Sequence, residues 1–329
     1  MISRICSFVI VIFFTFSSSV NAGGLIFGVS AHPENFYGSN EEFLETLVKY
    51  NIKAVRFDYP WSQMEKNKGI FTPLSENNKT EYLINNAWRY NIKLMAILDY
   101  GNNIYGIDKP QDGYQIGKFS AYCGWVAKHL NHKVEIFEIW NEWTSKNFDK
   151  DNINASAANY VNLVGECSSE IRKINRNVII IAGSYNPMNG VDKSWGRELV
   201  KLGIMKYIDG ISIHPYAYYD KNITSPDSLI KIIEQTRYEL NKINGEENDI
   251  FITEIGFPSS FREGMTDEKI SFYFSEMYNL INMKPFIKSF IWYDFIDDGV
   301  DSNDKEQNFG ILKYNLQPKP IAQKFKEKN

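Results

Sequence analysis

The chain of 329 residues has little cysteine, little histidine and no surplus of basic residues. Its three cysteines are too few for a disulfide-stapled fold, and their spacing fits no zinc motif. Because 36 Lys and Arg are outnumbered by 40 Asp and Glu, nucleic acid is not expected as a partner. A Gly-rich phosphate loop is also absent, which argues against an open, nucleotide-binding α/β sheet.

Long apolar runs are absent as well, apart from one at the amino terminus. Phe8 to Phe16 form an apolar run that follows Arg4 and precedes the small residues of Val20-Asn21-Ala22. This run is well short of the ~20 residues that span a bilayer, so the pattern indicates a cleaved signal peptide over residues 1–22. We therefore expect a secreted or periplasmic protein with no membrane span after cleavage.

Two cysteines remain once Cys6 is removed with the signal peptide. Cys123 and Cys167 fall on two predicted helices that are neighbours in chain order. In an oxidising compartment they could form one disulfide, or they could stay as two separate buried thiols. The sequence leaves both alternatives open.

Hydrophobic residues make up 43% of the chain, which excludes a disordered protein. Short runs rich in Val and Ile alternate with helical patterns throughout residues 23–329. Such strands are typical of a parallel sheet covered on both faces, and eight strand–helix units predict one α/β domain, a single (β/α)8 TIM barrel. The expected strands are Leu25–Val29, Ala54–Phe57, Leu94–Leu98, Val134–Ile139, Val178–Ala182, Gly210–Ile213, Ile250–Thr253 and Ser289–Trp292. The expected helices are Glu41–Tyr50, Glu81–Tyr90, Ser120–Leu130, Ala155–Ile174, Gly196–Leu202, Ser228–Ile243, Asp267–Met283 and Ile321–Lys326.

In such a barrel the loops that follow the strands meet at one mouth, where active sites lie. Ionisable and aromatic side chains follow nearly every expected strand. In chain order they are Ser30 and His32; Arg56, Asp58, Trp61 and Glu65; Asp99 and Tyr100; Trp140, Asn141, Glu142 and Trp143; Ser184 and Tyr185; His214 and Tyr216; Glu254; and Trp292, Tyr293 and Asp294. A barrel with a purely structural role would not need this concentration of polar groups.

Glu142 and Glu254 follow the fourth and seventh strands, so they should face each other across the mouth. Cleavage of a glycosidic bond needs such a pair, one carboxyl protonated to donate to the leaving oxygen and one ionised to attack the anomeric carbon. Arg56 and Tyr216 are placed to donate hydrogen bonds to Glu254 and keep it ionised. Apolar groups such as Trp140 and Trp143 would instead keep Glu142 protonated.

Taken singly, these features have simpler interpretations. A second Asn-Glu pair at Asn40-Glu41 is expected only to open a helix. His214 alone would more often be a structural histidine, and Trp88 and Trp125, both on predicted helices, are expected to be packing residues. The combination after successive strands, rather than any one residue, points to catalysis.

Several segments resemble the motifs of clan A retaining glycoside hydrolases. Ile139-Trp140-Asn141-Glu142 resembles their W-N-E acid/base motif, and Phe251 to Gly256 (FITEIG) resembles their T-E-x-G nucleophile motif. His214-Pro215-Tyr216 is similar to the H-x-Y motif of strand six, whose tyrosine touches the nucleophile in the clan. Val55 to Glu65 resembles the V-R-x-D-x-x-W-x-x-x-E run of family 39-like members, and Asn308 to Pro320 resembles the clan's usual ending.

The resemblance covers essentially all of residues 23–329, in the expected order. Family 39-like enzymes, including those associated with bacterial exopolysaccharides, rank first, and family 5-like enzymes second. Family 39 xylosidases usually carry an additional β-sandwich, for which no residues remain here. Xylosidase specificity is therefore not carried over.

The resemblance implies a retaining mechanism with Glu142 as general acid/base and Glu254 as nucleophile, their carboxyl groups ~5–5.5 Å apart. Trp292 is the expected floor under the sugar. The other expected supporting or substrate-binding residues are Asn141, Arg56, His214, Tyr216, His32, Asp58, Trp61, Tyr100, Trp143, Tyr218 and Tyr219.

Neither a metal nor any other cofactor is expected, because His32 and His214 stand singly rather than as a metal-binding pair. The expected partner is an oligo- or polysaccharide, and the protein is expected to be a monomer. The main alternative is a catalytically inactive carbohydrate-binding barrel, and a structural or adhesive envelope protein is a further one.

Overall fold

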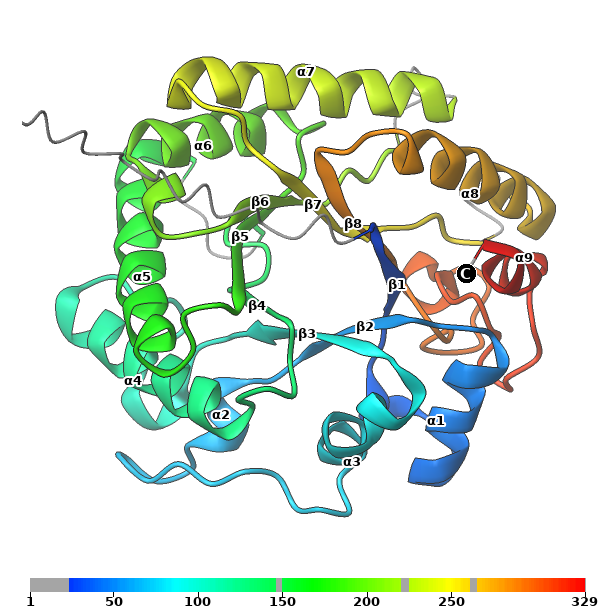
Figure 1. The fold of residues 1–329 in the computed structure, drawn as a ribbon, viewed down its shortest axis with the longest axis horizontal. Coiled ribbons are helices and arrows are strands. Elements are labelled where there is room, and N and C mark those ends of the chain that lie inside the picture. Colours follow the sequence, from blue (N-terminus) through cyan, green and yellow to red (C-terminus); the bar gives the residue numbers. More distant parts are fainter. Residues whose placement is uncertain (1–23, 146–149, 220–224, 261–264, 329) are drawn as a thin grey trace, which may run out of the picture.

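The computed structural model describes residues 24–145, 150–219, 225–260 and 265–328. Eight parallel strands pair in chain order, β1 with β2 and so on, and β8 closes the ring on β1 (Figure 1). This is the predicted (β/α)8 barrel. The strands are β1 (Ile26–Ser30), β2 (Ala54–Asp58), β3 (Lys93–Leu98), β4 (Ile136–Ile139), β5 (Ile179–Tyr185), β6 (Gly210–Ile213), β7 (Ile250–Ile255) and β8 (Ile287–Trp292). The expected signal peptide, residues 1–22, lies outside the described residues.

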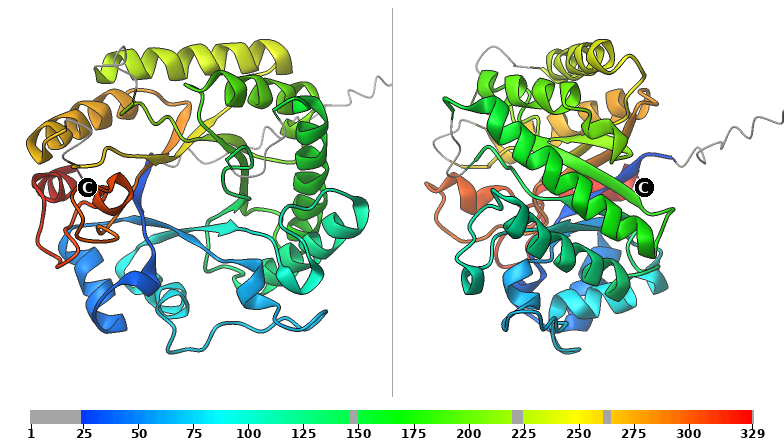
Figure 2. Two further views of the ribbon diagram at one scale, coloured as in Figure 1. Left: turned by 180° about the vertical axis from the view of Figure 1, so that it is seen from behind. Right: turned by 90° about the vertical axis from the view of Figure 1, so that its left-hand side faces the viewer.

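Helices form an outer ring around the strands, as the views from behind and from the side show (Figure 2). The α-helices are α1 (Asn40–Lys49), α2 (Trp61–Met64), α3 (Lys79–Asn86), α4 (Gly113–His129), α5 (Ile153–Ile174), α6 (Gly190–Lys201), α7 (Pro226–Asn244), α8 (Asp267–Asn282) and α9 (Pro320–Lys328). Five short 3-10 helices accompany them in the described residues: η1 (Pro33–Asn35), η2 (Ala87–Tyr90), η3 (Asn103–Tyr105), η4 (Ile204–Lys206) and η5 (Lys305–Asn308). None of the helices in the part of the chain that the structure describes has both the length and the apolarity of a membrane span.

All eight expected strands and all eight expected helices are present, and the differences lie at their ends. Helices α4 and α6 begin several residues earlier than predicted, because Asp112 and Asn189 cap them by accepting hydrogen bonds from backbone amides. The helix expected over Glu81–Tyr90 ends at Asn86 and continues as the 3-10 turn η2. The one-turn helix α2 was not predicted.

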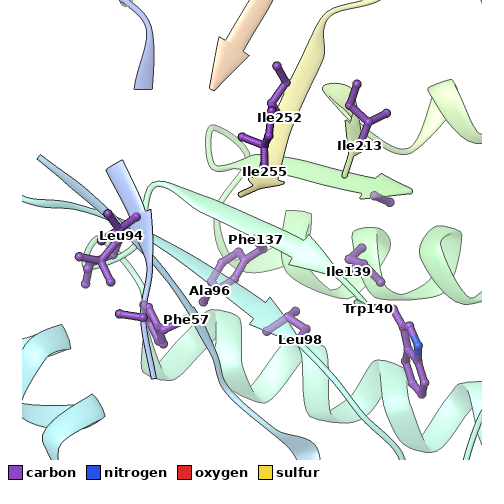
Figure 3. Packing of buried hydrophobic residues seen from close by; sticks show 14 of the residues in the cluster. Phe57, Leu94, Ala96, Leu98, Phe137, Ile139, Trp140, Ile213, Ile252 and Ile255 are labelled. Atoms are coloured by element: carbon purple, nitrogen blue, oxygen red, sulfur yellow. The ribbon is translucent and has the colours of Figure 1, made fainter. Parts of the chain in front are cut away.

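Successive residues of each strand point alternately outward, to the helices, and inward, to the barrel interior. Outward-facing side chains such as Phe57, Leu94 and Phe137 pack in the large core between strands and helices (Figure 3). A second, smaller apolar cluster is separate from it and lies inside the barrel. Its buried members are Ala54, Met95, Ile136, Ile181, Phe251 and Ile291.

The residue two positions after a member of the inner cluster also faces inward, nearer to the carboxyl end of its strand. On β2, β4 and β7 these residues are Arg56, Glu138 and Thr253, and the position that follows β8 is Tyr293. The barrel interior therefore changes from apolar to polar toward the mouth.

Helices α4 and α5 pack side by side over the barrel (Figure 2). A disulfide joins Cys123 of α4 to Cys167 of α5, whose Cα atoms are 5.5 Å apart. Both cysteines are fully buried. Of the two alternatives that the sequence left open, the structure contains the bonded one.

Candidate active site

A cavity of about 310 Å³ lies at the carboxyl ends of the strands. It is lined by half of the side chains that the sequence pattern placed at the mouth. Its lining residues are Ser30, Ala31, His32, Arg56, Phe57, Asp58, Ile97, Tyr100, Asn141, Glu142, Tyr216, Tyr218, Glu254, Tyr293, Glu306 and Phe309.

Arg56 of β2 is buried and binds three partners at the base of this cavity. Its Nε donates to Glu138 over 2.6 Å, Nη1 donates to Glu254 over 2.6 Å and Nη2 donates to Asn141 over 2.8 Å. Burial alone would lower the pKa of Arg56, but Glu138 and Glu254 raise it, so the guanidinium stays charged. Asn141 in turn donates to the hydroxyl of Tyr100 over 2.9 Å.

Glu254 of β7 is only 7% exposed, yet it is surrounded by donors and positive charge. One carboxylate oxygen accepts from Arg56, and the other accepts from the hydroxyl of Tyr216 over 2.7 Å. Burial acts to raise the pKa of Glu254, but His214, Arg56 and Tyr216 outweigh it and lower the pKa below the usual value. Arg56 and Tyr216 are the two donors that the sequence predicts, and they favour the ionised form of Glu254.

Glu142 follows β4 and, unlike Glu254, reaches into solvent, with a side chain that is 37% exposed. One of its oxygens lies 3.0 Å from Nδ1 of buried His214, and that same nitrogen lies 3.6 Å from Glu254. A carboxylate oxygen of Glu142, one of Glu254 and a ring nitrogen of His214 all lie within 4.8 Å of one another. The two glutamates therefore share one cavity and one histidine.

The sequence pattern predicted that Trp140 and Trp143 crowd the Glu142 carboxyl, and the structure places them elsewhere. Trp140 packs against Phe119 of α4, with ring centres 5.4 Å apart, and its indole points away from the barrel strands (Figure 3). Trp143 is buried and donates from its indole to Ser156 over 3.0 Å. The neighbour that holds Glu142 is His214.

One residue that supports the site, Glu138, was not singled out from the sequence. Glu138 of β4 is fully buried and accepts hydrogen bonds from Ser184 and Thr253, each over 2.9 Å, as well as from Arg56. Thr253 also contacts Nε2 of His214 over 3.0 Å. The available signal was Glu138 itself, a carboxylate within an otherwise apolar strand, because a buried charge needs a partner.

The backbone adopts left-handed conformations where β4 and β5 meet the cavity. The φ angles are 65° at Trp140, 45° at Glu142 and 49° at Ser184. Non-glycine residues rarely adopt positive φ, at a cost of about 1–3 kcal/mol each, and such residues concentrate at functional sites. The turn after β4 directs Glu142 toward His214 in spite of this cost.

His32 and Asp58 line the opposite wall, where Nδ1 of His32 lies 3.5 Å from Asp58. Burial lowers the pKa of His32, but Asp58 and other carboxylates raise it to about 9. Asp99 is fully buried beside Asp58, and burial together with the charge of Asp58 raises the pKa of Asp99 well above its usual value. Burial and the neighbouring Asp58 charge thus both favour the neutral form of Asp99.

The prediction that Trp292 forms the floor of the cavity is wrong. Trp292 is fully buried and packs outside the barrel against Phe274 of α8. The next residue, Tyr293, lines the cavity instead, with its hydroxyl 3.4 Å from Nε2 of His32. The reason is the alternation of a strand, in which Ile291 and Tyr293 face inward while Trp292 faces the helices.

Four other aromatic predictions divide between the core and the mouth. Trp61 and Trp143 are buried in the core and do not line the cavity. Trp61 donates from its indole to Glu65 over 2.6 Å. Tyr218 lines the cavity, whereas Tyr219 is half-exposed beyond it, where its hydroxyl accepts from Asn186 over 2.7 Å.

Glu142 also borders a second cavity, of about 300 Å³, on its other side. The loops after β4 and β5 and the start of α6 form this cavity. None of the described residues that line it is aromatic. They are Glu142, Thr144, Ser145, Lys150, Ser184, Asn186, Asn189, Val191 and Asp192.

Two groups of described residues bring possible metal-ligand atoms within 4.8 Å of one another. One is Glu142, His214 and Glu254, whose ligand atoms already engage one another and the donors Arg56 and Tyr216. The other is His32 with Asp294 and Asp298. In the first group Arg56 and Tyr216 already donate to the carboxylate oxygens of Glu254.

Comparisons with known proteins show the same fold. Among solved structures, a family 39 glycoside hydrolase from the gut symbiont Bacteroides cellulosilyticus WH2 matches 93% of this chain and 63% of its own, with 21% identity and a TM-score of 0.75. Xylanase 10B from Thermotoga maritima matches 92% of this chain and 94% of its own, with 15% identity and a TM-score of 0.68. These likenesses show the barrel fold.

A curated relative from Saccharomyces cerevisiae, the probable family 17 glucosidase SCW4, is 26% identical over 156 residues. The match covers 47% of this chain and 35% of the yeast protein, so it spans about a third of that relative's length. The model of the family described as Cellulase (glycosyl hydrolase family 5) matches residues 18–292. The expected clan is confirmed, and of the two families ranked from the sequence the matching model is that of the second. The chain belongs to glycosyl hydrolase family 5.

Proposed function

We propose that the protein is a retaining glycoside hydrolase in which Glu254 is the nucleophile and Glu142 the general acid/base. The observation that carries the proposal is the approach of two carboxylate oxygens, one from each glutamate, to within 4.8 Å across a shared cavity. A separation of ~5–5.5 Å between the carboxyl groups suits a covalent glycosyl-enzyme intermediate, whereas a water-mediated inverting mechanism needs ~6.5–9.5 Å.

The different surroundings of the two carboxyls support different roles. Arg56 and Tyr216 keep Glu254 ionised, so it can attack the anomeric carbon while the bond to the leaving oxygen breaks. Glu142 donates its proton to that oxygen. It then removes a proton from water, which attacks the anomeric carbon and releases Glu254.

His214 lies where it can exchange this proton with Glu142. Its Nε2 donates a hydrogen bond to Thr253. Its Nδ1 can therefore accept a hydrogen bond from Glu142 when that carboxyl is neutral, or donate one when Glu142 is ionised and the histidine is protonated. Both protonation states of the acid/base therefore keep the same hydrogen-bond partner.

The substrate that we propose is an oligo- or polysaccharide. The cavities on either side of Glu142 offer space for sugar units on both sides of the cleaved bond. The descriptions of the family and relatives name a cellulase, a glucosidase and a xylanase, so β-glucans and xylans are the first substrates to test. We further propose that the protein is secreted or periplasmic and acts as a monomer.

Chemical rescue tests the two roles separately. With an activated aryl glycoside of the sugar selected in the substrate screen, Glu254→Ala should lose turnover, and added azide should restore it with inverted product configuration. Glu142→Ala should retain activity toward good leaving groups. Full activity in either variant, or a loss in both that azide does not rescue, would contradict the assignment. Binding of polysaccharide without release of reducing ends would identify an inactive carbohydrate-binding barrel.

A further inference from the structure

An exposed tryptophan lies at the end of the barrel opposite to the mouth. Trp88 belongs to η2, just before β3, and is 74% exposed, although its helical pattern predicted a packing residue. It lines a cavity together with Lys93, the first residue of β3, and Glu135, which directly precedes β4. The catalytic groups follow the carboxyl ends of the same strands. This cavity is therefore separate from the active site.

Its indole ring is held in a fixed position. Nε1 of Trp88 donates to the backbone carbonyl of Asn85 over 3.0 Å, and Lys133 donates to the Asn85 side chain over 2.9 Å. The Arg89 guanidinium lies 5.8 Å from the ring centre. Because the indole N–H is already used, the ring offers a ligand a flat apolar surface that is ordered before binding.

The rim around this ring is polar and carries both signs of charge. The cavity measures about 320 Å³, and its polar lining includes Asn85, Asn91, His132, Lys133 and Glu135. A lipid surface or an apolar protein partner would need a wider apolar patch, and nucleic acid would need a surplus of positive charge. A sugar ring has an apolar C–H face and a rim of hydroxyls, which matches a single aromatic ring within a polar rim.

We propose that Trp88 and the polar residues around it form a second saccharide-binding site. The ligand would be a neutral segment of the same polymer that is cleaved at the mouth, so the class of ligand rests on the proposed function. Binding at the rear of the barrel would keep the enzyme on the polymer between cleavage events. It would not change the chemistry at Glu142 and Glu254.

Affinity electrophoresis tests the site with named polymers. Native gels containing the neutral polymers hydroxyethyl-cellulose, barley β-glucan or xylan are run with Glu254→Gln as the parent, so that the polymer is not degraded. Adding Trp88→Ala should weaken retardation about tenfold in apparent affinity, as expected for loss of one stacking platform. Adding Tyr238→Ala, which removes a 62% exposed aromatic ring from α7, should leave the parent's retardation unchanged.

The single variant Trp88→Ala in the active enzyme should hydrolyse the small substrate 4-nitrophenyl β-cellobioside at the wild-type rate. Both aromatic side chains are exposed, so thermal unfolding should be unaffected. The proposal is overturned if no gel retards the parent, or if Trp88→Ala is retarded like the parent in every gel. Retardation measures binding alone, so this outcome is distinct from a failure of the catalytic assignment, which azide rescue detects.

Discussion

Thr253 accepts a 3.0 Å hydrogen bond from Nε2 of His214, because its own hydroxyl proton is donated to Glu138 over 2.9 Å. Glu138 also accepts from Arg56 over 2.6 Å. Arg56 contacts Glu254, and His214 contacts Glu142. One buried carboxylate that does not line the cavity therefore positions the groups that hold both glutamates.

Replacement of Glu138 by glutamine should damage stability and activity together. The amide retains the shape of the carboxylate, but it loses the charge that balances Arg56 and one of the two oxygens that accept hydrogen bonds. Removal of one partner from a buried ion pair costs about 3–5 kcal/mol. Glu138→Gln should therefore lower the free energy of unfolding in urea by roughly that amount, and kcat/KM should fall with it.

Glu45→Gln on the exposed surface of α1 is the matched control, because it removes the same charge without a buried partner. If Glu138→Gln unfolds at the same urea concentration as this control, Glu138 does not have the positioning role that its contacts indicate.

The pH profile of kcat/KM should show how His214 affects the pKa of Glu254. The pKa of Glu254 is lowered by His214 and Arg56, against the effect of burial, and kcat/KM falls in acid as Glu254 takes up a proton. His214→Gln removes one of the groups that lower the pKa of Glu254, so this pKa should rise and the acidic limb should move to higher pH. His129→Gln, on α4, changes a histidine outside the cavity and should leave the limb in place. A limb that stays put, or moves to lower pH, in His214→Gln would refute this coupling.

Two adjacent aromatic residues after β8 should behave in opposite ways. Trp292 is fully buried in the outer core, so Trp292→Ala should cost about 3–5 kcal/mol of stability. Tyr293 lines the cavity, so Tyr293→Ala should lower kcat/KM about tenfold, which corresponds to loss of one aromatic contact with the sugar, and should change stability little. Thermal unfolding and kinetics on the same samples separate the two. Strong destabilisation by Tyr293→Ala with unchanged activity would reverse the assignment.

This pair also shows how far the sequence could predict the structure. The continuous apolar strands predicted the barrel, and the barrel alone brought Arg56, Tyr216 and Glu254 together, because all strand ends meet at one mouth. A shift of one residue along the strand decides which of two consecutive aromatic residues faces inward. A run of aromatic and apolar residues does not reveal this register. The sequence therefore does not distinguish Trp292 from Tyr293 as the residue that faces the cavity.

Two other features depend on contacts between distant parts of the chain. Glu138 lies in an apolar run, and its function becomes visible only when β2 and β7 bring Arg56 and Thr253 beside it. Trp88 is exposed because α3 ends at Asn86 and gives way to a 3-10 turn, which changes the direction of the following side chains. Helical periodicity continued past this point predicts a packed indole.

The second cavity beside Glu142 predicts where the leaving group binds. In its proposed role as general acid, Glu142 must lie between the sugar that is attacked and the group that departs. Glu254, the proposed nucleophile, lines only the first cavity, so the leaving sugar should occupy the second, where Asp192 is half-buried. Burial raises the pKa of Asp192, while a hydrogen bond from Thr144 opposes that rise.

Asp192→Asn should therefore discriminate between substrates. A hydrogen bond between a carboxylate and a sugar hydroxyl contributes about 1.5–3 kcal/mol, so kcat/KM on an oligosaccharide should fall at least about tenfold. A 2,4-dinitrophenyl glycoside has no sugar in that cavity and needs little help from the acid, so its hydrolysis should stay close to wild type. Asp227→Asn, at the exposed start of α7, should affect neither. Equal losses on both substrates would place Asp192 in support of the catalytic groups rather than in contact with the leaving sugar.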